Sequence, residues 1–256
     1  MKLFMGGKIR ILVLISALIF PSLLTFVYFV LLSGESGGVQ RLVYGAGKIF
    51  QFLIPIIFIF FLERQIVRTT DKFHSIANGD QNSGKFKLYY LGEGIFFGLF
   101  VFCAMFFLYC FCIGVKGGEL AEGSAAHRVI VDKVSGFGLI DWRLFFLLGF
   151  FYSVIHSGLE EYYWRWFVFG KLRVICGVWT AIIISGLGFA AHHVILLHTF
   201  FGLGSVLCPL GSIAIAIGGI YWAWLYQRSG NLWGAWFGHG IIDAAIFLIG
   251  YMICFR

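Results

Sequence analysis

The chain has 256 residues, of which 60% are hydrophobic and only 12% carry a charge. Soluble domains carry about 25% charged residues, so these polar side chains cannot cover a water-facing surface. The net charge is +7, but Lys and Arg stand singly or in pairs between apolar runs. That pattern is typical of orientation signals in a membrane protein, and it excludes a nucleic-acid partner.

We predict an all-α fold, a polytopic transmembrane helix bundle in the lipid bilayer. Within a bilayer every backbone polar group must be paired inside its own segment, so the apolar runs should be helices. A span needs about 20 apolar residues. The runs predict seven spans, or eight if interfacial helices are counted, at residues 9–32, 44–62, 90–115, 144–169, 174–201, 210–226 and 231–254.

The breaks between the runs predict the orientation. The first run is too long for a signal peptide and no cleavage site follows it, so we interpret it as a retained span. Lys and Arg are enriched in cytoplasmic loops. With seven spans, four basic segments fall on one side, and we expect a cytoplasmic N-terminus in a plasma or inner membrane. The basic residues of the 63–89 loop are Arg64, Arg68, Lys72, Lys85 and Lys87. The 116–143 loop carries acids as well, and we expect an amphipathic surface segment near 129–140.

Carboxylates are rare in the last four spans. From residue 144 to the end there are only three, Glu160, Glu161 and Asp243, and all three lie inside apolar runs. A charged side chain at the centre of a span costs about 2.5–3.5 kcal/mol even on a mild insertion scale. Such residues are functional candidates, expected to face the bundle interior or a wet cavity.

The first polar cluster lies in the fourth span. Glu161 and Arg165 are four residues apart, so they share a helix face and can pair. Glu160 points about 100° away, because a helix turns once per ~3.6 residues. We therefore expect Glu161 to be neutralised by Arg165 while Glu160 faces a cavity. A purely structural ion pair would leave Glu160 unexplained.

The second and third clusters carry histidines. His192 and His193 are adjacent in the fifth span and should point to different faces, so we expect only one to enter a site. The small residues before them, Gly186, Gly188, Ala190 and Ala191, should let a neighbouring helix approach closely. In the seventh span His239 and Asp243 are at i and i+4 on one face, where the carboxylate could orient the imidazole.

The three clusters together resemble a known family. Glu160-Glu161-x-x-x-Arg165, Phe189-x-x-x-His193 and His239-x-x-x-Asp243 are similar to the three motifs of the CPBP family. Its members are intramembrane proteases related to the Rce1-type CAAX prenyl endopeptidase, and bacterial members are often called Abi proteins. The resemblance covers about 155–245, and the family's third motif often ends in Asn where this chain has Asp243. Phe189, four residues earlier, favours His193 over His192 as the family histidine.

The resemblance implies an intramembrane endopeptidase, with residues 1–143 as N-terminal helices and 144–256 as a four-helix catalytic core. It implies that Glu160 and His193 activate a water, and that His239 and Asp243 bind the substrate carbonyl or the oxyanion. Glu161 would complete the catalytic set, while Arg165, Phe189 and His192 support it. The partner would be a peptide or protein in the membrane, either membrane-associated, prenylated or a peptide precursor.

A metal is the open point of this chemistry. Glu160, His193 and His239 could bind zinc with one open position. We favour a site without a cofactor, because no second-shell carboxylate is evident for His193. The chain has no HExxH and no GxSxG motif, so a zincin or a serine hydrolase is disfavoured.

Two other functions remain as alternatives. A transporter or proton-coupled channel would also bury acids and histidines in spans, but it would more often show repeats, and none is visible. An inactive scaffold or immunity member of the family would be expected to lack motif residues. The predicted spans also carry a difficulty, since straight helices would set Glu160 and His193 about 15 Å apart in height. We therefore expect residues 168–178 to lie along the interface, so that the fifth helix starts later.

Overall fold

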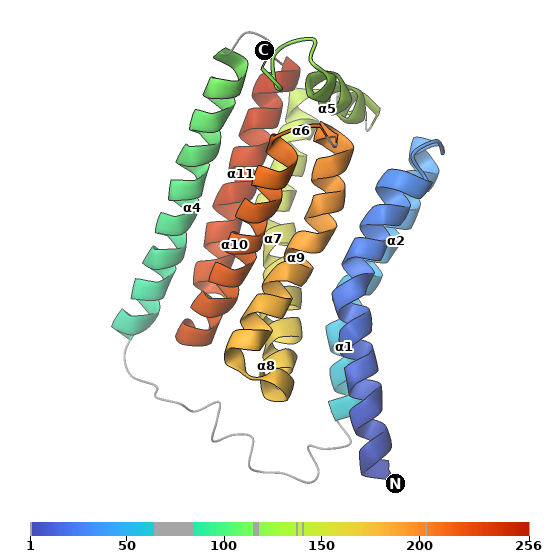
Figure 1. The fold of residues 1–256 in the computed structure, drawn as a ribbon, viewed down its shortest axis with the longest axis vertical. Helices are drawn as coiled ribbons and strands as arrows, with labels where there is room; N and C mark the ends of the chain where they lie inside the picture. Colours follow the sequence, from blue (N-terminus) through green and yellow to red (C-terminus); the bar gives the residue numbers. More distant parts are fainter. Residues whose placement is uncertain are drawn as a thin grey trace.

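The protein is an all-α bundle in which the described elements run nearly parallel or antiparallel (Figure 1). The computed structural model describes residues 2–63, 84–114, 118–136, 138–139, 141–202 and 204–255. Seven helices in these ranges are long and apolar enough to cross a membrane, so the predicted count of seven is confirmed. They are Lys8–Leu31, Gly37–Phe61, Leu88–Cys112, Trp142–Cys176, Val178–Phe201, Leu207–Ser229 and Trp233–Phe255. The two termini lie at opposite ends of the bundle, as an odd number of crossings requires (Figure 1).

The helices outside the family motifs come first in the chain. They are α1 (Lys2–Phe26) with the π-helical η1 (Val27–Leu31), α2 (Gly37–Phe58) with η2 (Ile59–Glu63), α4 (Gly84–Gly114) and the short α5 (Ala125–Gly136). Helix α5 overlaps the segment predicted to be amphipathic at 129–140. Several loop residues used to predict orientation, Arg64, Arg68 and Lys72, lie outside the described residues, and the cytoplasmic N-terminus stays a prediction. So does a domain boundary after residue 143.

The fourth span is much longer than predicted. It is one continuous helix built from α6 (Trp142–Phe150), η4 (Phe151–His156), α7 (Ser157–Glu161), η5 (Tyr162–Phe169) and α8 (Gly170–Cys176). At 1.5 Å per residue its 35 residues would measure about 50 Å, so it must tilt or extend beyond a hydrocarbon core of about 30 Å. The expectation that residues 168–178 lie along the membrane interface stays a prediction, but they do not form a separate segment, because Gly170–Cys176 continues the helix.

The extra length of that helix brings Glu160 and His193 to the same level along the helix axes. The chain reverses only at Gly177, whose φ of +81° suits glycine, and α9 (Val178–Phe201) starts there, later than residue 174 as expected. Glu160 is 16 residues before Cys176, and His193 is 15 residues after Val178. Both therefore lie about 22–24 Å from the turn, at the same level of the helix pair.

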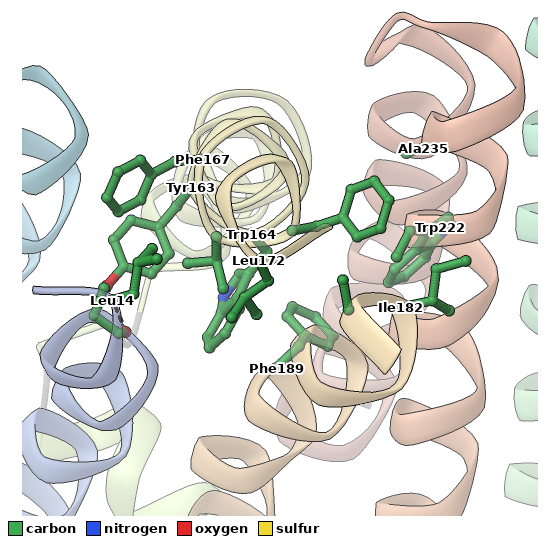
Figure 2. Packing of buried hydrophobic residues seen from close by; sticks show 14 of the residues in the cluster. Leu14, Tyr163, Trp164, Phe167, Leu172, Ile182, Phe189, Trp222 and Ala235 are labelled. Atoms are coloured by element: carbon green, nitrogen blue, oxygen red, sulfur yellow. Dashed lines mark hydrogen bonds between the residues drawn. The ribbon is translucent and has the colours of Figure 1, made fainter. Parts of the chain in front are cut away.

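Aromatic residues of η5 form the centre of the core. Tyr163, Trp164 and Phe167 are completely buried, and Figure 2 shows Tyr163 reaching α1 while Trp164 lies beside Phe189 of α9. The Tyr163 hydroxyl donates to the carbonyl of Ala17 at 2.7 Å. That carbonyl is four residues before Pro21, which has no N–H to offer it. The hydroxyl thus gives this carbonyl the hydrogen bond that lipid could not supply, and it links α1 to the fourth span.

Glycines allow the close helix contacts. As predicted for the fifth span, Gly186 of α9 packs against α10 (Leu207–Ser229), where an added Cβ would lie 2.8 Å from the Ile220 nitrogen. Between α4 and α11 (Trp233–Phe255) the glycines are Gly94, Gly98, Gly234 and Gly238, at the small-xxx-small spacing of close transmembrane packing. These contacts fix the helix that carries His239.

A single methyl group should disturb this contact. A Cβ on Gly94 would lie 2.0 Å from the Gly234 carbonyl oxygen, whereas one on Gly92 would meet nothing within 4 Å. We expect Gly94→Ala to lower the free energy of unfolding by about 1–3 kcal/mol, as overpacking does, and Gly92→Ala to leave it nearly unchanged. Thermal unfolding of the two purified variants measures the difference. Equal stabilities would show that α4 does not pack on α11 in this register.

Candidate active site

Glu160 and Glu161 occupy a single α-helical turn between two π-helical stretches of the fourth span. Helix α7 spans only Ser157–Glu161, with η4 before it and η5 after it. Interruptions of this kind are frequent at functional sites, because they change the face on which successive side chains project. Both carboxylates are buried, with Glu160 2% and Glu161 0% exposed.

The predicted Glu161–Arg165 ion pair is present. Arg165 Nε lies 3.0 Å from Glu161 Oε2, and both side chains are inaccessible to solvent. The guanidinium lies over two neighbouring rings, 4.7 Å from the centroid of Phe189 and 5.2 Å from that of Trp222. Cation–π contacts of this kind gain strength when desolvated. Phe189 therefore packs on Arg165, the cation that pairs with Glu161.

His239 is oriented by Glu161. Its Nδ1 is 2.8 Å from Glu161 Oε1, and its ring stacks on Trp222 at 4.6 Å between centroids. Because a carboxylate oxygen accepts, Nδ1 carries the proton and donates it. The other nitrogen, Nε2, lies 3.7 Å from Asp243 Oδ1. The expectation that Asp243 orients the imidazole is therefore wrong: Glu161 does so, and Asp243 flanks the nitrogen that faces the site.

Glu160 is surrounded by nitrogen atoms. Within 4 Å of its Oε1 are Lys48 Nζ at 3.2 Å and the Nε2 atoms of His156 and His192, each at 3.7 Å. Oε2 faces His239 Nε2 at 3.9 Å. The carboxylate predicted to face a cavity is thus the centre of a buried polar cluster, to which four helices contribute.

Both histidines of the fifth span reach this cluster. One potential ligand atom from each of Glu160, His192 and His193 lies within 4.8 Å of the other two. The expectation that only one histidine enters the site is therefore wrong. His193 Nδ1 lies 2.9 Å from the Phe189 carbonyl, four residues earlier, and must donate to it. That bond leaves Nε2 of a neutral His193 as a free acceptor.

Two contributors, Lys48 and Trp222, were not predicted from the sequence, and His156, four residues before Glu160, was assigned no role. Lys48 lies in α2, far from the motifs, and is only 9% exposed. A signal for it existed, because it is the one charged residue between positions 44 and 62, inside a predicted span, and charges there are functional candidates. Trp222 had no such signal, since aromatic residues are common in spans.

The donor types at Glu160, His192 and His193 match a zinc site, but their surroundings do not. One carboxylate and two imidazoles form a known catalytic zinc set. A metal bridging Glu160 and His192 would sit beside Oε1, the oxygen that already contacts the Lys48 ammonium. The expected third ligand, His239, is not in this group: its Nδ1 binds Glu161, and its Nε2 lies 3.9 Å from the other Glu160 oxygen, Oε2. These residues do not fit a divalent ion while Lys48 holds its place.

Comparison with known proteins agrees with the geometry. The sequence model of the family described as type II CAAX prenyl endopeptidase Rce1-like matches residues 142–245. No curated protein and no solved structure matches the chain significantly. The matched segment begins with α6 and ends just after Asp243, so it holds all three motifs and excludes Lys48. Over residues 142–245 the chain is therefore similar to the Rce1-like family, as the motifs predicted.

Proposed function

We propose that the protein is a membrane-embedded endopeptidase in which Glu160 activates a water molecule for attack on a peptide bond. The observation that carries the proposal is the buried Glu160 carboxylate, within 4 Å of imidazole nitrogens from three positions and grouped with His193. The family match supports a CAAX-type intramembrane protease at the level of the family. Substrate and mechanism are our inference.

The spacing of Glu160 and His193 suits one bridging water. Both groups can accept a hydrogen bond, the carboxylate always and His193 through Nε2 when Nδ1 donates to Phe189. A water that donates two bonds of about 2.8 Å spans roughly 4.4 Å between its acceptors. One ligand atom from each of Glu160, His192 and His193 lies within 4.8 Å of the other two, which is compatible with such a bridge. Such a water has both protons engaged and directs its lone pairs toward a substrate carbonyl.

Glu160 then acts as general base and later as general acid. It takes a proton from the water as the oxygen bonds to the carbonyl carbon, and it gives that proton to the departing amine as the C–N bond breaks. A buried site strengthens each of these interactions because water does not screen them.

His239 would stabilise the oxyanion. As an imidazolium it donates Nδ1–H to Glu161 and offers Nε2–H, between Glu160 and Asp243, to the carbonyl oxygen. A fixed donor aimed at developing negative charge is often the largest contribution to catalysis. Arg165 balances Glu161, so that this carboxylate stays in place to orient the ring.

The test is cleavage of membrane-anchored peptides by the purified full-length protein in liposomes. We would use prenylated peptides, matched unprenylated peptides and single-span precursors, with products identified by mass spectrometry. We expect at least one class to be cleaved by the wild type and by Glu122→Gln, an exposed carboxylate outside the site, but not by Glu160→Gln. Folded wild-type protein that cleaves none of them, or cleavage unchanged by Glu160→Gln, would contradict the proposal and favour a transporter or an inactive family member.

A further inference from the structure

Lys48 is a buried cation of the second span that uses the catalytic carboxylate as its partner. Its side chain is 11% exposed, and its Nζ lies 3.2 Å from Glu160 Oε1. Among the residues that the structure describes, it is the one lysine or arginine within 4.0 Å of a Glu160 oxygen. Because an uncompensated charge in a span is costly, the two groups stabilise each other in this position.

The ammonium is held from its sides by aromatic rings. Nζ lies 5.8 Å from the centroid of Tyr44 and 5.7 Å from that of Phe52, both on α2. These distances are within the range of cation–π contacts. No other acid in the described part of the chain lies within 4.0 Å of Nζ. The cation thus has one anionic partner and a fixed place beside Oε1.

We propose that the Lys48 ammonium is the built-in cation of this site, occupying the position at Glu160 Oε1 that a divalent metal would need and so keeping the Glu160–His192–His193 cluster metal-free. The inference rests on the proposed function, in which Glu160 is the general base, and it identifies Lys48 as the residue that holds Glu160 in position. It assigns Lys48, outside the matched family segment, a positioning role that acts through Glu160.

Geometry and charge carry this proposal together. His192 Nε2 and Lys48 Nζ approach the same carboxylate oxygen, at 3.7 and 3.2 Å. A metal bound by Glu160 and His192 would therefore lie within a few ångströms of the ammonium, and the two cations would repel each other strongly at low dielectric. Oε2 faces His239 Nε2 at 3.9 Å, and in the proposed mechanism that nitrogen carries a proton and has no lone pair to offer a metal.

The experiment measures metal binding without substrate. Full-length protein is purified in detergent, stripped with a chelator and titrated with Co²⁺, while the visible d–d absorption reports the ligand field. Zn²⁺ competition and metal analysis give the stoichiometry. The variants are Lys48→Met, Lys48→Gln, Lys48→Arg and the double variant Lys48→Met with Glu160→Gln. Lys133→Met is a matched control, since Lys133 also lies over two rings, at 5.9 Å from Tyr28 and 5.5 Å from Phe29.

The wild type, Lys48→Arg and Lys133→Met are expected to bind no Co²⁺ tightly. Lys48→Met and Lys48→Gln should bind one ion about 100-fold or more tightly than the wild type, because the repelling charge is gone. The Glu160→Gln substitution should abolish that binding.

Two results would overturn the proposal. One is tight one-to-one binding by the wild type that Glu160→Gln removes, which is decisive even if the Lys48 variants do not fold. The other is folded Lys48→Met or Lys48→Gln protein that binds Co²⁺ no better than the wild type. Peptide cleavage plays no part in this readout, so failure of the metal inference and failure of the peptidase proposal are separate results.

Discussion

Glu160→Gln is expected to lower peptide hydrolysis by about 10²–10⁴-fold, the range associated with loss of a general base. The amide has nearly the same shape as the carboxylate but cannot take a proton from water. It also leaves the Lys48 ammonium, 3.2 Å away and largely buried, without an anion. Breaking a buried pair at one partner is strongly destabilising, so we expect a loss of about 3 kcal/mol in the free energy of unfolding.

Adding Lys48→Met separates the two effects of this substitution. With both partners neutral, the double variant should recover most of the lost stability, because no buried charge remains unpaired. It should recover no activity, because the base is still missing. Thermal or denaturant unfolding and the cleavage assay, made on the same preparations, provide the comparison. Stability that stays at the level of Glu160→Gln would show that Lys48 and Glu160 are not coupled.

Arg165→Met should be the most destabilising single change at the site. Arg165 is 1% exposed and pairs with Glu161 at 3.0 Å, so its removal leaves a buried carboxylate with His239 as its one remaining ion-pair partner among the described residues. We expect a loss of about 3–5 kcal/mol, with activity falling as well, because Glu161 holds Nδ1 of His239. Arg143→Met, at an exposed position of the same helix, should be nearly neutral.

The companion variant Glu161→Gln tests the cause of that loss. Combined with Arg165→Met it removes both charges, and this double variant should be clearly more stable than Arg165→Met alone. Activity should stay low, since the amide binds His239 less strongly than a carboxylate does. A double variant that is less stable still would mean that packing of Arg165 on Phe189 and Trp222, rather than charge, dominates.

The spans, and the acids and histidines that form the polar cluster, could be predicted from the sequence. Both predictions follow from the free-energy cost of placing polar groups in lipid. Seven apolar runs became seven helices, and the pair of Glu161 with Arg165 followed from helix periodicity. The length of the fourth helix could not be predicted in this way. The charged residues Lys171 and Arg173 indicated its end, although the helix continues through them to Cys176.

Side-chain partners were harder to predict than positions. A regular α-helix sends His192 and His193 to different faces, yet both reach Glu160. Asp243 has the correct i, i+4 spacing to His239. However, His239 Nδ1 binds Glu161, from another helix, and Asp243 lies near Nε2 without binding it closely. Lys48 was missed for a related reason. Contacts between helices far apart in the chain depend on rotation and tilt, which periodicity does not fix.

A single turnover in water enriched in oxygen-18, with enzyme in excess over a peptide that the protein cleaves, distinguishes attack by water from attack by Glu160. If Glu160 activates a water, the new carboxyl group of the product carries one heavy oxygen, and the Glu160 side chain carries none. Heavy oxygen in Glu160 with none in the first product would mean that Glu160 attacks the peptide itself, and would contradict the account.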